Sequence, residues 1–218
     1  MISLPALVLV GLVGGVQLLE TVLDGLNVRY GASAVRDAEA WVREALDVDD
    51  PEEMLAYQRS KTILSGIQSW LGVAVLLAVV VSGVYGDVAR QLSATGLPSV
   101  AQGVVLLAGA VLAGRFLSAP FDAYETFVVE ERFGFNNQTV VLWLRDLVVG
   151  TVVALAFGGL IAGAVLLAVD ALPTLWPVVG WAIVVGFSLL MMIVYPRVIA
   201  PLFNDFDPID DGALREAV

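Results

Sequence analysis

The sequence has 218 residues and a net charge of −11, and 59% of its residues are hydrophobic. Soluble domains are about 45–50% apolar, so this composition is typical of a membrane protein. The acidic charge argues against nucleic acid as a partner, because binding to phosphates requires a basic surface. With a single lysine, it is also typical of a protein adapted to concentrated salt, where repulsion between charges is screened. The absence of histidine and cysteine removes the commonest metal ligand, the usual general base and every thiolate site.

Five apolar runs are long enough for the roughly 20 residues that a helix needs to cross a bilayer. They lie near residues 3–23, 63–85, 99–118, 147–169 and 175–197. The first run has no Lys or Arg before Arg29 and no clear cleavage site, so we interpret it as a retained span rather than a signal peptide. The sequence therefore predicts an all-α, polytopic membrane protein whose residues 1–218 form a single membrane domain.

The basic residues predict the orientation of the chain, because Lys and Arg concentrate in cytoplasmic loops. Of the 11 basic residues, only Arg90 lies on one side of the predicted spans. All the others lie near the first loop, the third loop (119–146) or the tail (198–218). We therefore expect a multi-pass protein of the cell membrane, with its N-terminus outside and its C-terminus in the cytoplasm.

Residues 31–60, between the first two spans, are predicted to form amphipathic helix at the cytoplasmic membrane surface. One apolar stripe recurs there at helical spacing: Ala34, Val35, Ala38, Trp41, Val42 and Leu46. Asp50 and Pro51 are expected to begin a second helix, as its N-cap and its first residue.

The predicted spans contain patterns of small residues that allow helix backbones to approach closely. Gly11 and Gly15 form one such pair, and Gly159 and Gly163 form another. Packing within one bundle and dimerisation both remain open as explanations. No charge lies in the middle of a predicted span, which argues against an ion-coupled carrier or a channel.

The third loop is unusually polar for this chain. Pro120 is expected to end or kink the third span, and Gly134 suits a left-handed helix C-cap. Asn136 or Asn137 is expected to cap the next helix. Glu130 and its neighbour Glu131 would point in different directions on a helix, so we do not expect a Ca²⁺ or Mg²⁺ site with Glu125.

Three stretches of the sequence resemble the type I CAAX prenyl proteases, which are integral-membrane zinc metallopeptidases. The stretches are Phe127–Thr139 (FVVEERFGFNNQT), Tyr57–Lys61 (YQRSK) and Tyr195–Phe206 (YPRVIAPLFNDF), followed by Pro208 and Leu214. They occur in the family's order and at the expected places relative to the spans.

The resemblance implies membrane helices that enclose a chamber, with a zinc peptidase domain on the cytoplasmic side. It also implies cleavage of prenylated C-terminal peptides, or proteolysis of membrane proteins. Family catalysis depends on an H-E-x-x-H motif that binds zinc. This chain has no histidine and stops before the region where the family carries the motif. We therefore expect only the N-terminal five-span module, with zinc present only in a full-length relative and no proteolysis by this chain alone.

Two sets of residues are expected to contact a zinc peptidase domain supplied in cis or in trans. The first lies in the third loop: Glu125, Glu130, Glu131, Arg132, Phe133, Gly134, Phe135 and Asn136. The second lies at the exit from the fifth span: Tyr195, Pro196, Pro201, Leu202 and Phe203. Without that domain, the tail from Asp205 to Val218 is expected to be mobile. The alternative is a stand-alone membrane scaffold or partner-binding protein that has lost the protease chemistry.

Overall fold

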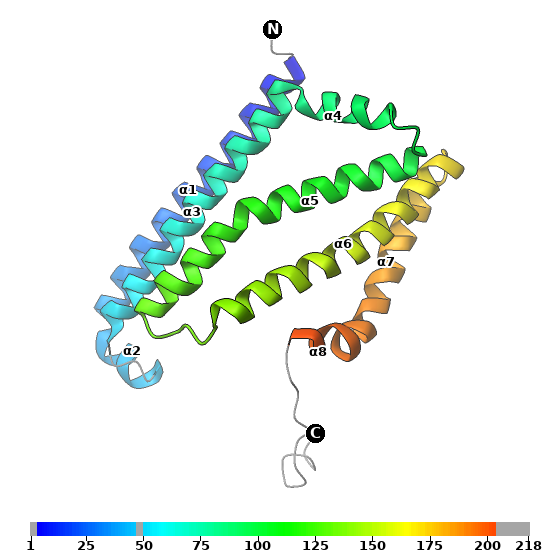
Figure 1. Cartoon of the computed structure of the whole chain (residues 1–218). Helices are drawn as coiled ribbons and strands as arrows, with labels where there is room; N and C mark the ends of the chain where they lie inside the picture. The colour runs from blue at the N-terminus through cyan, green and yellow to red at the C-terminus, as the bar shows by residue number, and fades with distance from the viewer. Residues whose placement is uncertain (1–3, 47–49, 204–218) are drawn as a thin grey trace, which may run out of the picture. The chain divides into compact units, whose positions relative to one another are not determined.

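The computed structural model of the chain describes residues 4–46 and 50–203. Every regular element within these residues is a helix, and they contain no strand (Figure 1). The elements are α1 (Leu4–Asp37), α2 (Glu39–Leu46), α3 (Pro51–Ser82), α4 (Val84–Ser93), α5 (Ser99–Tyr124), η1 (Glu125–Glu130), α6 (Val140–Ala171), α7 (Trp176–Val194), η2 (Tyr195–Ile199) and α8 (Ala200–Phe203). The predicted all-α fold is confirmed. The predicted mobile tail, Asp205 to Val218, lies outside the described residues.

Five helical stretches are long and apolar enough to cross a membrane. They are Ala6–Asp37, Pro51–Ser82, Ser99–Glu130, Val140–Ala171 and Trp176–Phe203. Five membrane-spanning helices are thus confirmed. Each stretch extends beyond its apolar run because the flanking polar residues continue the helix.

Large apolar side chains cover much of the surface of these helices. Phe116 is 85% exposed and Val141 is 80% exposed, and among the described residues only five hydrophobic side chains are buried. A water-soluble protein of this size would bury a large core, whereas helices in a bilayer can present apolar side chains to lipid. The exposed apolar surface therefore fits a protein in contact with the lipid bilayer.

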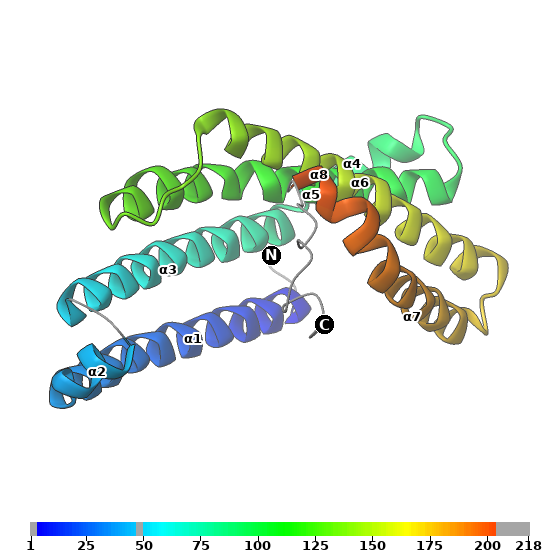
Figure 2. The same ribbon diagram turned by 90° about the horizontal axis from the view of Figure 1, so that it is seen from below.

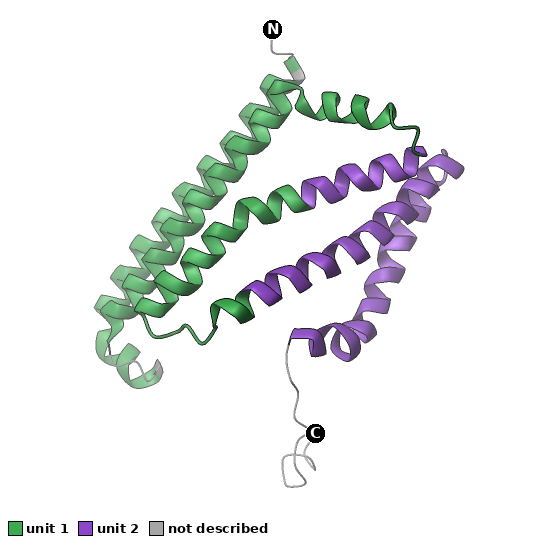
Figure 3. Cartoon of the chain, in the orientation of Figure 1, with its two compact units in different colours: residues 1–97, 112–143 green, residues 98–111, 144–218 purple. Residues whose placement is uncertain are grey.

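The chain divides into two compact units (Figure 3). Unit 1 contains residues 1–97 and 112–143, and unit 2 contains residues 98–111 and 144–218.

In unit 1, α1 and α3 pack against each other along their lengths (Figures 1 and 2). The Nε1 of Trp70 donates a hydrogen bond to the Oγ1 of Thr21 at 3.0 Å, and the Nε of Arg36 lies 2.7 Å from the Oε1 of Glu52. Because the earlier residue of α1 meets the later residue of α3, the two helices are antiparallel.

In unit 2, side chains of α5, α6 and α7 meet. The rings of Phe157 and Phe187 lie 5.8 Å apart, and Cβ atoms added at Gly159 and Gly163 would lie 3.8 and 3.7 Å from Val104. This glycine pair packs against α5 within the chain, which is one of the two explanations given for it. A Cβ at Gly11 would have no neighbour within 4 Å, and nothing in the structure explains that glycine.

Most of the described residues within 31–46 and 50–60 are helical, but they do not form a separate surface helix. α1 continues without interruption to Asp37, and only α2 is a short helix between the long ones. The predicted apolar stripe is correct at Val42, which is buried, and wrong at Trp41, whose side chain is 65% exposed. Asp50 caps α3 as predicted, because its Oδ1 accepts hydrogen bonds from the backbone N–H groups of Glu52 at 3.0 Å and Glu53 at 3.3 Å.

Pro120 does not end the helix that contains it. It lies inside α5, which runs to Tyr124 and passes directly into the π-helix η1. A proline in a helix removes one backbone hydrogen bond, but the remaining bonds and the packing can keep the helix continuous. The helix therefore continues beyond the predicted end of the third span near residue 118 and reaches Glu130.

Candidate functional site

The polar loop predicted from the sequence folds back onto α3 within unit 1. Its residues meet the first three turns of α3 in a group that we call the Lys61 cluster. The cluster consists of Tyr57, Lys61, Glu125, Glu130, Phe133 and Phe135.

Lys61 provides the charge of the cluster. Its Nζ lies 2.6 Å from the Oε1 of Glu125 and 3.8 Å from the Oε1 of Glu130. The three side chains are only partly exposed, at 39%, 33% and 27%. The ammonium group therefore joins α3 to both ends of η1, in a setting where water screens the charges less than on an open surface.

The π-helical geometry of η1 explains why both carboxylates reach one lysine. Residues five apart diverge by roughly 140° in an α-helix, which has about 3.6 residues per turn. In a π-helix the hydrogen bonds join residues five apart, so Glu125 and Glu130 lie on nearly the same side. This element could not be predicted, because no sequence pattern distinguishes a π-helical turn from an α-helical one.

Aromatic side chains form the second part of the cluster. The ring of Tyr57 contacts that of Phe133 edge-on, with centroids 5.4 Å apart, and that of Phe135 at 4.8 Å. The Nζ of Lys61 also lies 5.4 Å from the centroid of the Tyr57 ring. On the other side, the Arg132 guanidinium lies 5.5 Å from the centroid of the Phe133 ring. Such contacts add to the stability that apolar burial gives, so α3 and the loop are held together by more than the ion pairs.

The backbone turns sharply after η1. Gly134 has φ +73°, its N–H donates to the carbonyl of Glu131 at 3.2 Å, and the N–H of Phe135 donates to that of Glu130 at 2.9 Å. This pair of bonds defines a Schellman motif with glycine at the left-handed position. The predicted C-cap at Gly134 is confirmed, and the motif places Phe135 against Tyr57.

The predicted asparagine N-cap of the following helix was wrong. Thr139 caps α6, because its Oγ1 accepts a hydrogen bond from the N–H of Leu142 at 3.2 Å. Asn136 instead closes the loop: its Oδ1 accepts from the N–H of Gln138 at 2.8 Å and its Nδ2 donates to the Oε2 of Glu131 at 2.8 Å. Asparagine is favoured in both settings, and only the point where the helix begins decides between them.

The acidic residues of the loop are engaged by protein groups. Glu125 and Glu130 pair with Lys61, and Glu131 accepts from Asn136. Within residues 4–46 and 50–203, no group of three or more acidic side chains is placed to hold a metal ion. A catalytic zinc site takes histidine or cysteine ligands with a carboxylate, and the sequence has neither histidine nor cysteine. The residues of this chain do not fit such a zinc ion.

The second predicted set lies in unit 2, at the end of the fifth span. The guanidinium of Arg145 donates to the backbone carbonyl of Leu202 at 3.1 Å, and the ring of Phe203 lies about 4.0 Å from a Cβ added at Gly150. Tyr195 is 58% exposed, and Pro196 begins the π-helix η2 together with it. Leu202 and Phe203 thus hold the exit of this span against α6, whereas Tyr195 and Pro201 are exposed.

The comparison with known families agrees with this arrangement. The family described as the CAAX prenyl protease N-terminal domain, with five membrane helices, matches residues 33–205. The chain belongs to this family. The resemblance predicted from the three sequence stretches is confirmed, and the structure shows that two of them, Tyr57–Lys61 and Phe127–Thr139, meet in the Lys61 cluster.

Curated relatives in the family are CAAX prenyl proteases, and this chain matches only part of each. The rice (Oryza sativa subsp. japonica) CAAX prenyl protease 1 homologue is 34% identical over 133 residues, which cover 61% of this chain and 31% of the relative. The Arabidopsis thaliana homologue is 40% identical over 51% of this chain and 26% of the relative. CAAX prenyl protease 1 of Saccharomyces cerevisiae is 36% identical over 55% and 26%, respectively. The matched stretches therefore cover about a quarter to a third of the length of these family members.

A solved structure shows the same fold. The crystal structure of S. mikatae Ste24p matches all of this chain with a TM-score of 0.78 and 23% identity, and the match covers 52% of that protein. The chain is therefore an N-terminal membrane domain of the CAAX prenyl protease family, as the family match and the fold together show.

Proposed function

We propose that this chain is the membrane-embedded module of a CAAX-prenyl-protease-type peptidase. In this role its helices form part of an intramembrane chamber, and its loops form a docking surface for a zinc peptidase domain in the same or another polypeptide. The observation that carries the proposal is the family match over residues 33–205 in a chain without histidine. Zinc chemistry of the family's kind would have to come from another domain, so this chain by itself cleaves no peptide.

The geometry of the Lys61 cluster supports a division of roles within the loop. Glu125 and Glu130 are paired with Lys61, so they hold the loop on α3 rather than reach a partner. Arg132 is exposed, and Phe135 is 58% exposed at the tip of the same turn. Exposed aromatic and arginine side chains are enriched at the centres of protein interfaces. These two side chains are our candidates for contact with the peptidase domain.

An assay of the purified chain tests the catalytic part of this proposal. We expect no cleavage of a prenylated CAAX peptide and no stoichiometric zinc by elemental analysis. Zinc bound at one equivalent, or peptide cleavage that a chelator abolishes, would contradict the proposal.

Co-expression tests the docking part. A polypeptide containing the H-E-x-x-H domain of a full-length relative should co-purify with this chain. The double variant Arg132→Glu/Phe135→Ala should weaken that capture about tenfold or more, because interface residues of these two types can each contribute about 2 kcal/mol. Arg43→Glu on α2, an exposed charge reversal outside the loop, serves as the matched control. Equal capture of both variants would show that the loop is not the docking surface.

The coding DNA provides an independent test. An H-E-x-x-H sequence downstream of the Val218 codon, in frame or in a neighbouring gene, would supply the expected partner. A locus that encodes no zinc motif would count against the peptidase module and favour the stand-alone scaffold.

A further inference from the structure

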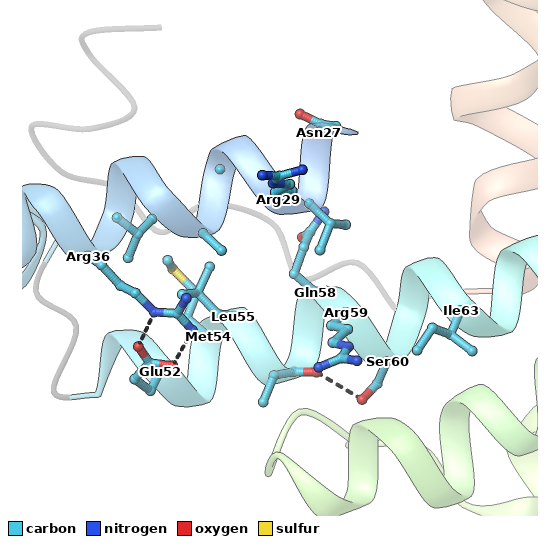
Figure 4. Close-up of a pocket in the computed structure, with 15 residues that line it drawn as sticks. Asn27, Arg29, Arg36, Glu52, Met54, Leu55, Gln58, Arg59, Ser60 and Ile63 are labelled. Atoms are coloured by element: carbon cyan, nitrogen blue, oxygen red, sulfur yellow. Dashed lines mark hydrogen bonds and ion pairs between the residues drawn. The ribbon is translucent and has the colours of Figure 1, made fainter. Parts of the chain in front are cut away.

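A groove of about 750 Å³ lies between parts of α1 and α3 in unit 1, and no residue of the Lys61 cluster lines it (Figure 4). Arg29 lines it from α1, and Gln58 and Arg59 line it from α3. Val28 and Ile63 add apolar side chains. The groove therefore combines hydrogen-bond donors with an apolar wall.

The antiparallel register places the two arginines at the same level. Arg29 precedes Arg36 by seven residues, and Arg59 follows Glu52 by seven residues, while Arg36 and Glu52 form an ion pair. Seven residues of helix rise by roughly 10 Å. Arg29 and Arg59 thus lie about the same distance from that ion pair and in the same direction along the helices.

The two guanidinium groups carry uncompensated charge. Arg36 is neutralised by Glu52, but neither Arg29 nor Arg59 has an acidic partner or a side-chain hydrogen bond within the part of the chain that the structure describes. Both side chains are exposed. Among the residues that line the groove, the only acid is Glu52, and it is paired with Arg36. Arg29 and Arg59 therefore make the groove a local basic site in a protein with a net charge of −11.

The two arginines lie just outside the predicted hydrocarbon core. The apolar run of α1 ends near residue 23, six residues before Arg29, and the apolar run of α3 begins at Ile63, one turn after Arg59. Phospholipid phosphates lie at this depth of a bilayer, and the planar guanidinium binds phosphate through two parallel hydrogen bonds.

We propose that this groove binds the headgroup of an anionic phospholipid. Arg29 and Arg59 hold the phosphodiester, Gln58 donates a further hydrogen bond, and the glycerol and first acyl carbons follow Val28 and Ile63. The proposal goes beyond the peptidase-module role and stands without it, because it rests only on α1 and α3.

Native mass spectrometry of the full chain in detergent tests the proposal, with phosphatidylglycerol as the anionic probe and phosphatidylcholine as the neutral one. We expect bound phosphatidylglycerol and little phosphatidylcholine. The double variant Arg29→Gln/Arg59→Gln should lower the affinity for phosphatidylglycerol roughly 30-fold, because each basic residue near an anionic lipid surface contributes about fivefold. The control Arg43→Gln/Arg90→Gln removes the same charge elsewhere and should leave the affinity unchanged.

A steric variant tests the groove without removing any charge. A Cβ at Gly31, which also lines the groove, would meet nothing within 4 Å, so Gly31→Leu should fold and fill the space. It should reduce phosphatidylglycerol binding while both arginines remain. Unchanged phosphatidylglycerol binding in the arginine double variant would overturn the proposal, and so would equal binding of phosphatidylcholine. Displacement of the lipid by millimolar inorganic phosphate would also overturn it, because it would indicate a site for free anions.

Discussion

Lys61 pairs with the acidic residues at both ends of η1, and its removal should loosen the loop. Lys61→Met leaves Glu125 and Glu130 partly buried and without their cation. We expect the free energy of unfolding to fall by about 1 kcal/mol, the upper end for partly exposed ion pairs. Lys61→Arg should keep most of the stability. Chemical denaturation in detergent measures both effects.

Arg90→Met is the matched control for Lys61. Arg90 pairs with Asp87 on one exposed helix, so its removal should change the stability by only a few tenths of a kcal/mol at most. If Lys61→Met were no more destabilising than Arg90→Met, the Lys61 cluster would not hold the loop.

Glycine is needed at position 134 because of its backbone conformation, not because a larger side chain would clash with a neighbour. Its φ is +73°, and an added Cβ would meet nothing within 4 Å. Gly134→Ala should therefore cost about 1–2 kcal/mol from backbone strain alone. Gly114→Ala in α5, where the surroundings are equally open but no positive φ is required, should be neutral or stabilising by up to about 1 kcal/mol. Thermal unfolding of both variants provides the comparison, and equal midpoints would contradict the strain argument.

The start of α3 depends on one side chain. Asp50 accepts two backbone hydrogen bonds in the first turn of the helix that carries Tyr57 and Lys61. Asp50→Ala should lower the free energy of unfolding by about 1 kcal/mol, whereas Asp50→Asn should restore most of it, because asparagine is also a good N-cap. Amide hydrogen exchange over residues 52–57 should rise in the alanine variant only. Unchanged exchange there would contradict the cap.

The apolar runs were sufficient to predict five spans, because hydropathy over about 20 residues is a direct consequence of bilayer thickness. They could not locate the helix ends. α1 continues through polar residues to Asp37, since a helix does not stop where its side chains become polar. Pro120 predicted an end or a kink, and the helix does not end there, because a single lost hydrogen bond in a long helix is tolerated.

The sequence indicated the members of the Lys61 cluster but not their contacts. The stretches Tyr57–Lys61 and Phe127–Thr139 were both recognised, yet nothing in their periodicity shows that they meet. The pairing of Lys61 with two glutamates depends on the π-helical turn, and the stability of that turn depends on the pairing. Ion pairs between α3 and η1 are tertiary contacts, and local sequence propensity does not predict a turn that depends on them.

The distribution of charge over the whole chain predicts its orientation in the membrane. Of the 11 basic residues, only Arg90 lies in the connection between α3 and α5, whereas the end of α1, α2 and the beginning of α3 together carry five: Arg29, Arg36, Arg43, Arg59 and Lys61. Because basic residues concentrate on the cytoplasmic side, α4 should lie on the external side of the membrane and α2 on the cytoplasmic side. The absence of cysteine makes the test clean, because any introduced thiol is unique.

Single-cysteine variants at two exposed positions test this orientation. Gln91→Cys in α4 should react with a membrane-impermeant maleimide on intact cells, and Glu53→Cys in the first turn of α3 should react only after permeabilisation. The reverse pattern would invert the topology and place the Lys61 cluster and the Arg29–Arg59 groove on the outer face. Labelling of both variants on intact cells would show mixed insertion, which is incompatible with a module that presents one loop surface to a peptidase domain on one side of the membrane.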